Sequence, residues 1–139
     1  MLTQCTECRR LVAVRLNPGE DIVASIGAAA REHGLQHALI LSGVGSVDRY
    51  HLHVVETPGG TIHDLFLEGE EPLDVLSLSG MVIAGRVHAH IALANREKAI
   101  GGHLEEGSRI LTCGVVGVAE VPALDLSQWD RVGDLQVCR

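Results

Sequence analysis

Aromatic side chains are nearly missing from this chain of 139 residues, which has one Phe, one Tyr and one Trp. A protein that binds single-stranded nucleic acid by stacking its bases needs such rings, so the composition disfavours that class. Basic residues are also scarce: 11 Lys and Arg face 18 Asp and Glu, and the formal net charge is −7. Because neutralising phosphates supplies most of the affinity for DNA, this balance disfavours direct DNA binding as well.

Long apolar runs and an ordered set of cysteines are lacking too. No stretch approaches the roughly 18 apolar residues of a membrane span, and no charged-then-apolar leader opens the chain. We therefore expect a cytoplasmic protein with no membrane partner. Cys5 and Cys8 form a CxxC pair, but Cys113 and Cys138 stand alone, so no four-cysteine zinc site is completed. We interpret the cysteines as free thiols in a reducing compartment.

One helix is indicated near the N-terminus, in a chain whose length suits a single domain. Asn17 is a good N-cap, Pro18 suits the first helical position, and Glu20 can reach back to the cap. Apolar residues follow at helical spacing, and Gly34 is a natural C-terminal stop. The pattern predicts a helix over residues 18–33.

Alternating patterns predict strands over most of the remaining chain, in which Leu, Val, Ile and Ala dominate the apolar residues. The expected strands are residues 11–16, 38–41, 47–55, 61–67, 73–83, 86–94 and 110–121, with turns at 42–46 and 58–60. We expect a mainly antiparallel α+β domain of six or seven strands with one main helix. It would occupy residues 11–121, between a loosely ordered polar leader, residues 1–10, and a C-terminal tail, residues 122–139.

The strand at residues 110–121 is apolar on both faces, and one helix covers too little of so wide a sheet. We therefore expect sheets to pack together across subunits of an oligomer.

Three histidines lie in a pattern typical of a metal site. His88 and His90 alternate with apolar residues, so both imidazoles project from one face of a strand, about 7 Å apart at their Cα atoms. His103 follows Gly101 and Gly102, which allow the backbone to turn back or approach closely. Three converging imidazoles leave a tetrahedral ion one open position, as in catalytic zinc sites. The alternative is three ordinary surface histidines on a solvent-facing strand.

A second set competes with the first. His51 and His53 repeat the HxH spacing, and His63 lies just beyond them, so spacing alone does not choose between the sets. The glycine pair favours the first set. Glu105 and Glu106 follow that set closely and are either groups that support a metal site or solvated surface carboxylates. No residue of the sequence is assigned a catalytic role, and no reaction is assigned.

Five motifs in order resemble the plant-and-prokaryote conserved (PPC) domain family. They are LNPGEDI from Leu16, LSGVGSV from Leu41, LSLSG from Leu76, HAH from His88 and GGHL from Gly101. The resemblance implies an α+β fold, assembly as a homotrimer, and a divalent metal, with zinc the usual ion. It implies His88, His90 and His103 as the ligands.

The resemblance leaves the biological role open. Bacterial and archaeal single-domain members are often labelled DNA-binding, but this chain has no Arg-Gly-Arg-Pro hook. Our first hypothesis is a homotrimer that binds a divalent metal and keeps one position open for water or a small anionic ligand. The alternative is a DNA-associated regulatory or protein-interaction module without catalytic activity. In a third hypothesis, the metal only holds the subunits together.

Overall fold

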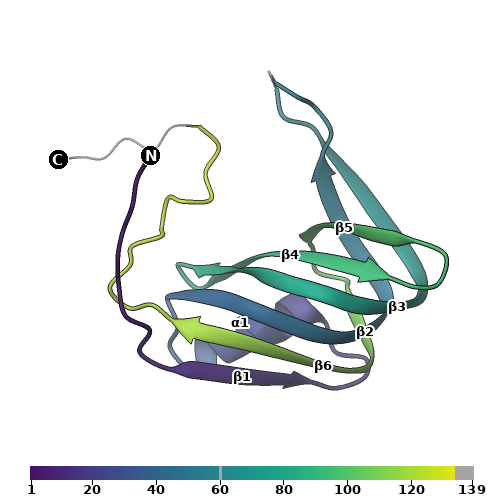
Figure 1. Cartoon of the computed structure of the whole chain (residues 1–139), viewed down its shortest axis with the longest axis horizontal. Coiled ribbons are helices and arrows are strands. Elements are labelled where there is room, and N and C mark those ends of the chain that lie inside the picture. The colour runs from purple at the N-terminus through teal and green to yellow at the C-terminus, as the bar shows by residue number, and fades with distance from the viewer. Residues whose placement is uncertain (60, 134–139) are drawn as a thin grey trace.

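A single helix lies against one face of an antiparallel sheet in the computed structural model, which describes residues 1–59 and 61–133 (Figure 1). The elements are, in chain order, β1 (Leu11–Leu16), α1 (Ile22–Glu32), β2 (His37–Val55), β3 (Asp64–Ile83), β4 (Arg86–Ala94), β5 (Ala99–Leu104) and β6 (Arg109–Glu120). The strand order is β1-β6-β2-β3-β4-β5. The expectation of an antiparallel α+β fold with one main helix is confirmed.

The helix begins later than the sequence predicts. Residues 17–20 form a turn in which the backbone N–H of Asn17 donates to Glu20, and the N-cap is Asp21. The Asp21 carboxylate accepts from the N–H of Ala24 at 2.8 Å and from the N–H of Gly107 at 2.6 Å. It is a better cap than Asn17 because it also binds the loop between β5 and β6. The predicted start at Pro18 is therefore wrong.

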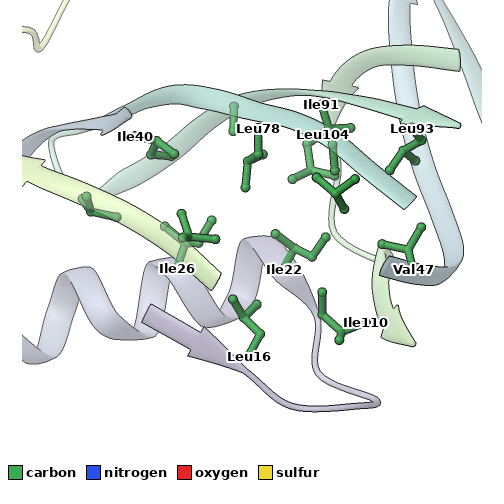
Figure 2. Packing of buried hydrophobic residues seen from close by; sticks show 14 of the residues in the cluster. Leu16, Ile22, Ile26, Ile40, Val47, Leu78, Ile91, Leu93, Leu104 and Ile110 are labelled. Carbon is green, nitrogen blue, oxygen red and sulfur yellow. The ribbon is translucent and has the colours of Figure 1, made fainter. Parts of the chain in front are cut away.

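The apolar side of α1 packs onto the sheet. Ile22, Ile26 and Ala30 recur every four residues and are 1%, 1% and 2% exposed. Figure 2 shows Ile22 and Ile26 pointing from the helix toward side chains of the strands. Burying such side chains contributes about 1.5–3 kcal/mol each for the larger ones. The helix ends where expected, because Gly34 takes a φ of +65°.

The sheet closes partly on itself. β5 pairs with β4 along one edge and also with β2, through Leu52 with Leu104 and His53 with His103. The sequence did not predict β5, because Gly101 and Gly102 were expected to form a return loop. Both glycines lie within the strand, and their role is close approach. A Cβ on Gly102 would lie 2.5 Å from the carbonyl oxygen of His53.

Two strands are longer than the sequence predicts. β2 runs without a break through residues 42–46, which were expected to be a turn, and β3 joins the two strands expected at 61–67 and 73–83. Irregular pairing explains the misleading pattern, since the register of β2 against β6 shifts between Ile40 and Ser42 and again between Gly45 and Val47. Gly45 lets β6 approach, because a Cβ there would lie 2.3 Å from the carbonyl oxygen of Cys113.

The far ends of β2 and β3 form a hairpin arm, residues 51–59 and 61–68, that extends past the rest of the sheet (Figure 1). Several of its apolar side chains are exposed: Val55, Ile62, Leu65 and Phe66 are 60%, 43%, 45% and 54% exposed. At the base of the arm, the Phe66 ring lies 5.6 Å from the rings of both His51 and His53.

The two terminal segments run beside each other (Figure 1). The side-chain amide of Gln4 donates to the carbonyl oxygen of Asp125 and accepts from its N–H, both at 2.9 Å. Neither the leader, residues 1–10, nor the described part of the tail, residues 122–133, contains a helix or strand. Cys138, the rest of the tail and Gly60 of the predicted turn lie outside the described residues. Within the described residues, no helix is long and apolar enough to span a lipid bilayer.

Gly80 gives the first prediction. It lies on β3 opposite Ala89 with a φ of +156°, and a Cβ there would lie 2.2 Å from the carbonyl oxygen of His88. We expect Gly80→Ala to lower the free energy of unfolding by about 2–3 kcal/mol, because the added methyl must push β3 away from β4. Urea denaturation measures this change.

Gly117→Ala is the matched control, since its Cβ would meet only Ser42 Oγ, at an ordinary 3.6 Å. We expect it to change the free energy of unfolding by less than about 1 kcal/mol. Equal effects of the two substitutions would show that the close approach at Gly80 does not constrain the sheet.

Candidate metal centre

His88 and His90 lie side by side on one face of β4. The residues that alternate with them, Ala89 and Ile91, face the core and are 1% and 4% exposed. The two imidazoles stack with centroids 5.7 Å apart and an interplanar angle of 15°. The alternation that predicted this strand and its polar face is therefore found, with the bounds of β4 as expected.

His103 joins this pair from β5. It is the register partner of His90, and its ring lies 5.4 Å from that of His90 and 4.7 Å from that of His88. One ring nitrogen of each histidine lies within 4.8 Å of those of the other two. The structure thus brings together the three histidines that the sequence singles out.

The donor set fits a divalent metal. In a tetrahedral zinc site with Zn–N bonds of about 2.0–2.1 Å, the nitrogens are about 3.3 Å apart. The separations between the ring nitrogens would therefore shorten by up to about 1.5 Å when an ion binds. His90 is exposed and the other two histidines are half-buried, so an ion can reach them.

His53 and Glu105 also lie at this site. The sequence placed His53 in the competing set and left Glu105 either as a group that supports the metal site or as a solvated surface carboxylate. The ring of His53 stacks on that of His103 with centroids 4.4 Å apart, and its Nδ1 lies 2.6 Å from Oε1 of Glu105. These three residues form a second group able to bind a metal. The interpretation of Glu105 as a solvated carboxylate is wrong. Because Glu105 engages the Nδ1 of His53, that nitrogen is less available to an ion.

The competing set predicted from His51, His53 and His63 does not form within the described residues. The Nδ1 of His51 instead lies 2.8 Å from the carbonyl oxygen of Glu106. His63 belongs to neither group of metal-binding side chains. The missed element was β5. The sequence predicted a strand over residues 47–55, which contains His53, but no strand over residues 99–104, and only a strand there can pair His103 with His53.

Burial and neighbouring rings favour the uncharged form of His90 and His103. Desolvation, followed by the repulsion of His88 and His53, lowers the pKa of His90 below its ordinary value of 6.5. Desolvation also lowers the pKa of His103, with repulsion from His53 and His88 adding to it and Glu105 opposing it. Neutral imidazoles are the form that binds metals, so both rings are ready to act as ligands at neutral pH.

A pocket of about 430 Å³ opens in front of the histidines. The polar part of its lining consists of His53, His88, His90 and His103 together with Asp64, and the remaining side chains are apolar. The apolar residues are Val54, Val55 and Ile62 from the hairpin arm and Val132 from the C-terminal segment. A ligand at the open position of a bound metal would enter this space.

One helix on a self-closing antiparallel sheet, with three histidines converging from β4 and β5, defines a small α+β domain with a candidate metal centre. The model of the Plants and Prokaryotes Conserved (PCC) domain family matches residues 3–122. The chain belongs to this family, which is the one that its sequence motifs resemble.

Curated relatives are much longer than this chain. The bifunctional protein GlmU of Synechococcus sp. (strain JA-2-3B'a(2-13)) is 32% identical over 120 residues, which cover 86% of this chain and 18% of that protein. The chain thus spans less than a fifth of the length of that relative.

Solved structures share the fold. The metal-containing protein AF0104 from Archaeoglobus fulgidus is 27% identical with a TM-score of 0.75, and the alignment covers 87% of this chain and 86% of that chain. A PPC protein from Pyrococcus horikoshii is 22% identical with a TM-score of 0.74, covering 90% and 87%. Two further structures, described as candidate DNA-binding proteins, are 21% and 16% identical, which shows a shared fold alone.

The lowered pKa values of His90 and His103 give the second prediction. Since both lie below the unfolded value of 6.5, the unfolded chain takes up protons first as the pH falls. The free energy of unfolding of the metal-free protein should therefore decrease from pH 6.5 down through the lowered values. Urea denaturation in chelator at pH 7.5 and pH 5.5 measures this loss. A His90→Gln/His103→Gln variant should lose less over the same interval, and an equal loss would contradict the assignment.

Proposed function

We propose that this chain is a metal-binding domain that holds one divalent cation, zinc, through His88, His90 and His103. The observation that carries the proposal is the approach of three ring nitrogens to within 4.8 Å of one another. The metal-containing relative from Archaeoglobus fulgidus supports it. We place the protein in the cytoplasm, which the free thiols of Cys5, Cys8 and Cys113 support.

Three neutral ligands determine what else the centre binds. They leave the full double charge of the ion uncompensated and one tetrahedral position open, so water or a small anionic ligand completes the shell. When bound, the metal supplies an electrophile that acidifies water or polarises a ligand oxygen. The pocket beside it is apolar at Val54, Val55 and Ile62, which suits a short aliphatic group on the ligand, and the carboxylate of Asp64 in the same lining disfavours a second negative charge there. His53 and Glu105 offer hydrogen bonds at the edge of this position.

We also propose that the domain assembles as a homotrimer, as the family resemblance implies. The sheet face opposite α1 carries a patch of exposed apolar side chains from β2, β3 and β6: Leu41, Val44, Leu76 and Val115, which are 55%, 61%, 62% and 44% exposed. Val44 and Val115 are register partners and lie together. An apolar patch on adjacent strands of an otherwise acidic chain supports an interface between copies.

The DNA-associated alternative has less support. The net charge of −7 repels phosphates, and the structures described as candidate DNA-binding proteins resemble this chain in fold alone. We therefore propose the metal centre as the functional site and leave DNA outside the proposal.

Metal content gives the third prediction. Protein purified without chelator or a nickel column should carry about one equivalent of metal per chain, and His88→Ala should carry less than about a tenth. Elemental analysis by mass spectrometry measures both. His63→Ala, which alters a histidine outside both groups, should keep the wild-type content. A wild-type content below a tenth, or an equal loss in His63→Ala, would refute the centre.

Assembly gives the fourth prediction. Val44→Asp places a charge in the patch opposite Val115 and should convert the trimer into monomers. Size-exclusion chromatography with light scattering at micromolar concentration measures the mass. Val132→Asp, at an 81% exposed residue of the C-terminal segment, is the control and should remain trimeric.

A wild-type monomer in the same measurement would contradict the trimer. Repeating it with chelator separates two roles of the metal. A trimer that persists without metal assigns the centre to ligand binding, whereas dissociation assigns it to holding the subunits together.

A further inference from the structure

The segment that follows β6 is anchored at the edge of the candidate metal centre. Val121 and Leu126 are 3% and 2% exposed and pack against Ile83 at the end of β3. A turn then carries the chain onward, with the N–H of Trp129 donating to the carbonyl oxygen of Leu126 at 2.9 Å. These contacts fix the position of the next residue, Asp130.

Asp130 has a carboxylate that is nearly buried and only partly hydrogen-bonded. Its side chain is 11% exposed, and its Oδ2 accepts a hydrogen bond from Arg86 at 3.1 Å. The same oxygen lies 4.0 Å from Nδ1 of His88. The other oxygen, Oδ1, is buried and has no hydrogen-bond partner among the described residues. A buried acceptor without a donor is destabilising, so this carboxylate has capacity for one more donor.

His88 is the nearby group that can supply this donor. A neutral imidazole carries its proton on one ring nitrogen and a lone pair on the other. If Nδ1–H points toward Asp130, the lone pair of Nε2 is left for a metal. His90 and His103 have no such support in residues 1–59 and 61–133, where no carboxylate oxygen lies within 4.0 Å of their ring nitrogens.

We propose that Asp130 is a positioning residue of the metal centre: its carboxylate accepts the Nδ1–H of His88 and directs Nε2 toward the ion. Metal-binding histidines commonly donate their second N–H to a carboxylate, which fixes the tautomer and strengthens the ligand. The inference rests on the proposed metal-binding function. It extends the centre beyond the matched family domain, which ends at residue 122.

The movement required is small. A charge-assisted N–H···O hydrogen bond has a length of about 2.7–2.9 Å. Nδ1 of His88 lies 4.0 Å from Oδ2, so His88 and the carboxylate must approach by about 1 Å, together with a rotation that turns Oδ1 toward the ring. The three histidine rings must rotate by a similar amount to bind one ion. Arg86 holds Oδ2 throughout, which leaves Oδ1 free to receive the imidazole N–H.

Asp130→Asn tests this role, because it keeps the shape of the side chain and removes the charge. With Arg86 holding the amide oxygen, the amide NH₂ faces His88 and donates to Nδ1, which moves the imidazole proton to Nε2. Two measurements at pH 7.5 follow. Competition with a chromophoric chelator gives the zinc affinity, and ring ¹⁵N shifts of His88 in metal-free protein give its tautomer.

We expect Asp130→Asn to weaken zinc binding by about 10-fold to 100-fold and to change the His88 tautomer from Nδ1–H to Nε2–H. Asp125→Asn is the control, since this carboxylate lies on the same segment but is 81% exposed and faces His37. It should change neither value. Asp130→Glu, which keeps a carboxylate, should retain the wild-type tautomer.

The outcomes separate the two proposals. Wild-type protein that binds no zinc refutes the metal centre, and the tautomer of the metal-free protein still decides the role of Asp130. An unchanged tautomer in a folded Asp130→Asn variant refutes the positioning role, even if zinc binding weakens, because the loss would then come from displacement of the segment. Equal zinc affinity in the wild type and Asp130→Asn also refutes it.

Discussion

The pairing of β5 with β2 is the contact on which the arrangement of the site depends. It consists of two register pairs, Leu52 with Leu104 and His53 with His103. The leucine pair is buried in the core, at 0% and 3% exposure, so hydrophobic burial stabilises the junction. The histidine pair lies on the opposite face because side chains alternate along each strand. One short contact thus anchors β5 to the core and places His103 between the rings of β4 and β2.

The sequence pattern predicted correctly those features that depend on residues close together in the chain. β1 and β4 have the predicted bounds, and Gly34 ends α1 as expected. The helix start was predicted at the wrong residue because Asn17 and Asp21 are both good caps, and only Asp21 has a second partner, in Gly107. That partner lies far along the chain, and nothing near Asp21 in the sequence indicates it.

The same distinction applies to the site. His88, His90 and His103 carry a local signal in their spacing and in the glycine pair. The pair of His53 with Glu105 does not, since it joins residues 52 positions apart through the pairing of β2 with β5, a strand that the sequence did not predict. Asp130 was missed for a different reason: its segment has no periodicity, and its place is set by the burial of Val121 and Leu126. The position of a segment without helix or strand, held in place by a few buried side chains, is the feature that sequence periodicity predicts least well.

The hairpin arm has a consequence for how this site can diversify. Its residues Val54, Val55 and Ile62 form much of the apolar wall of the pocket, yet none of them belongs to the buried core. Mutations there alter the shape offered to a ligand at little cost in folding free energy. The three histidines, by contrast, lie on β4 and β5, whose alternate residues form part of the buried core. In the proposed metal centre, substitutions in the arm can therefore change which ligand fits without changing the residues that would hold the ion.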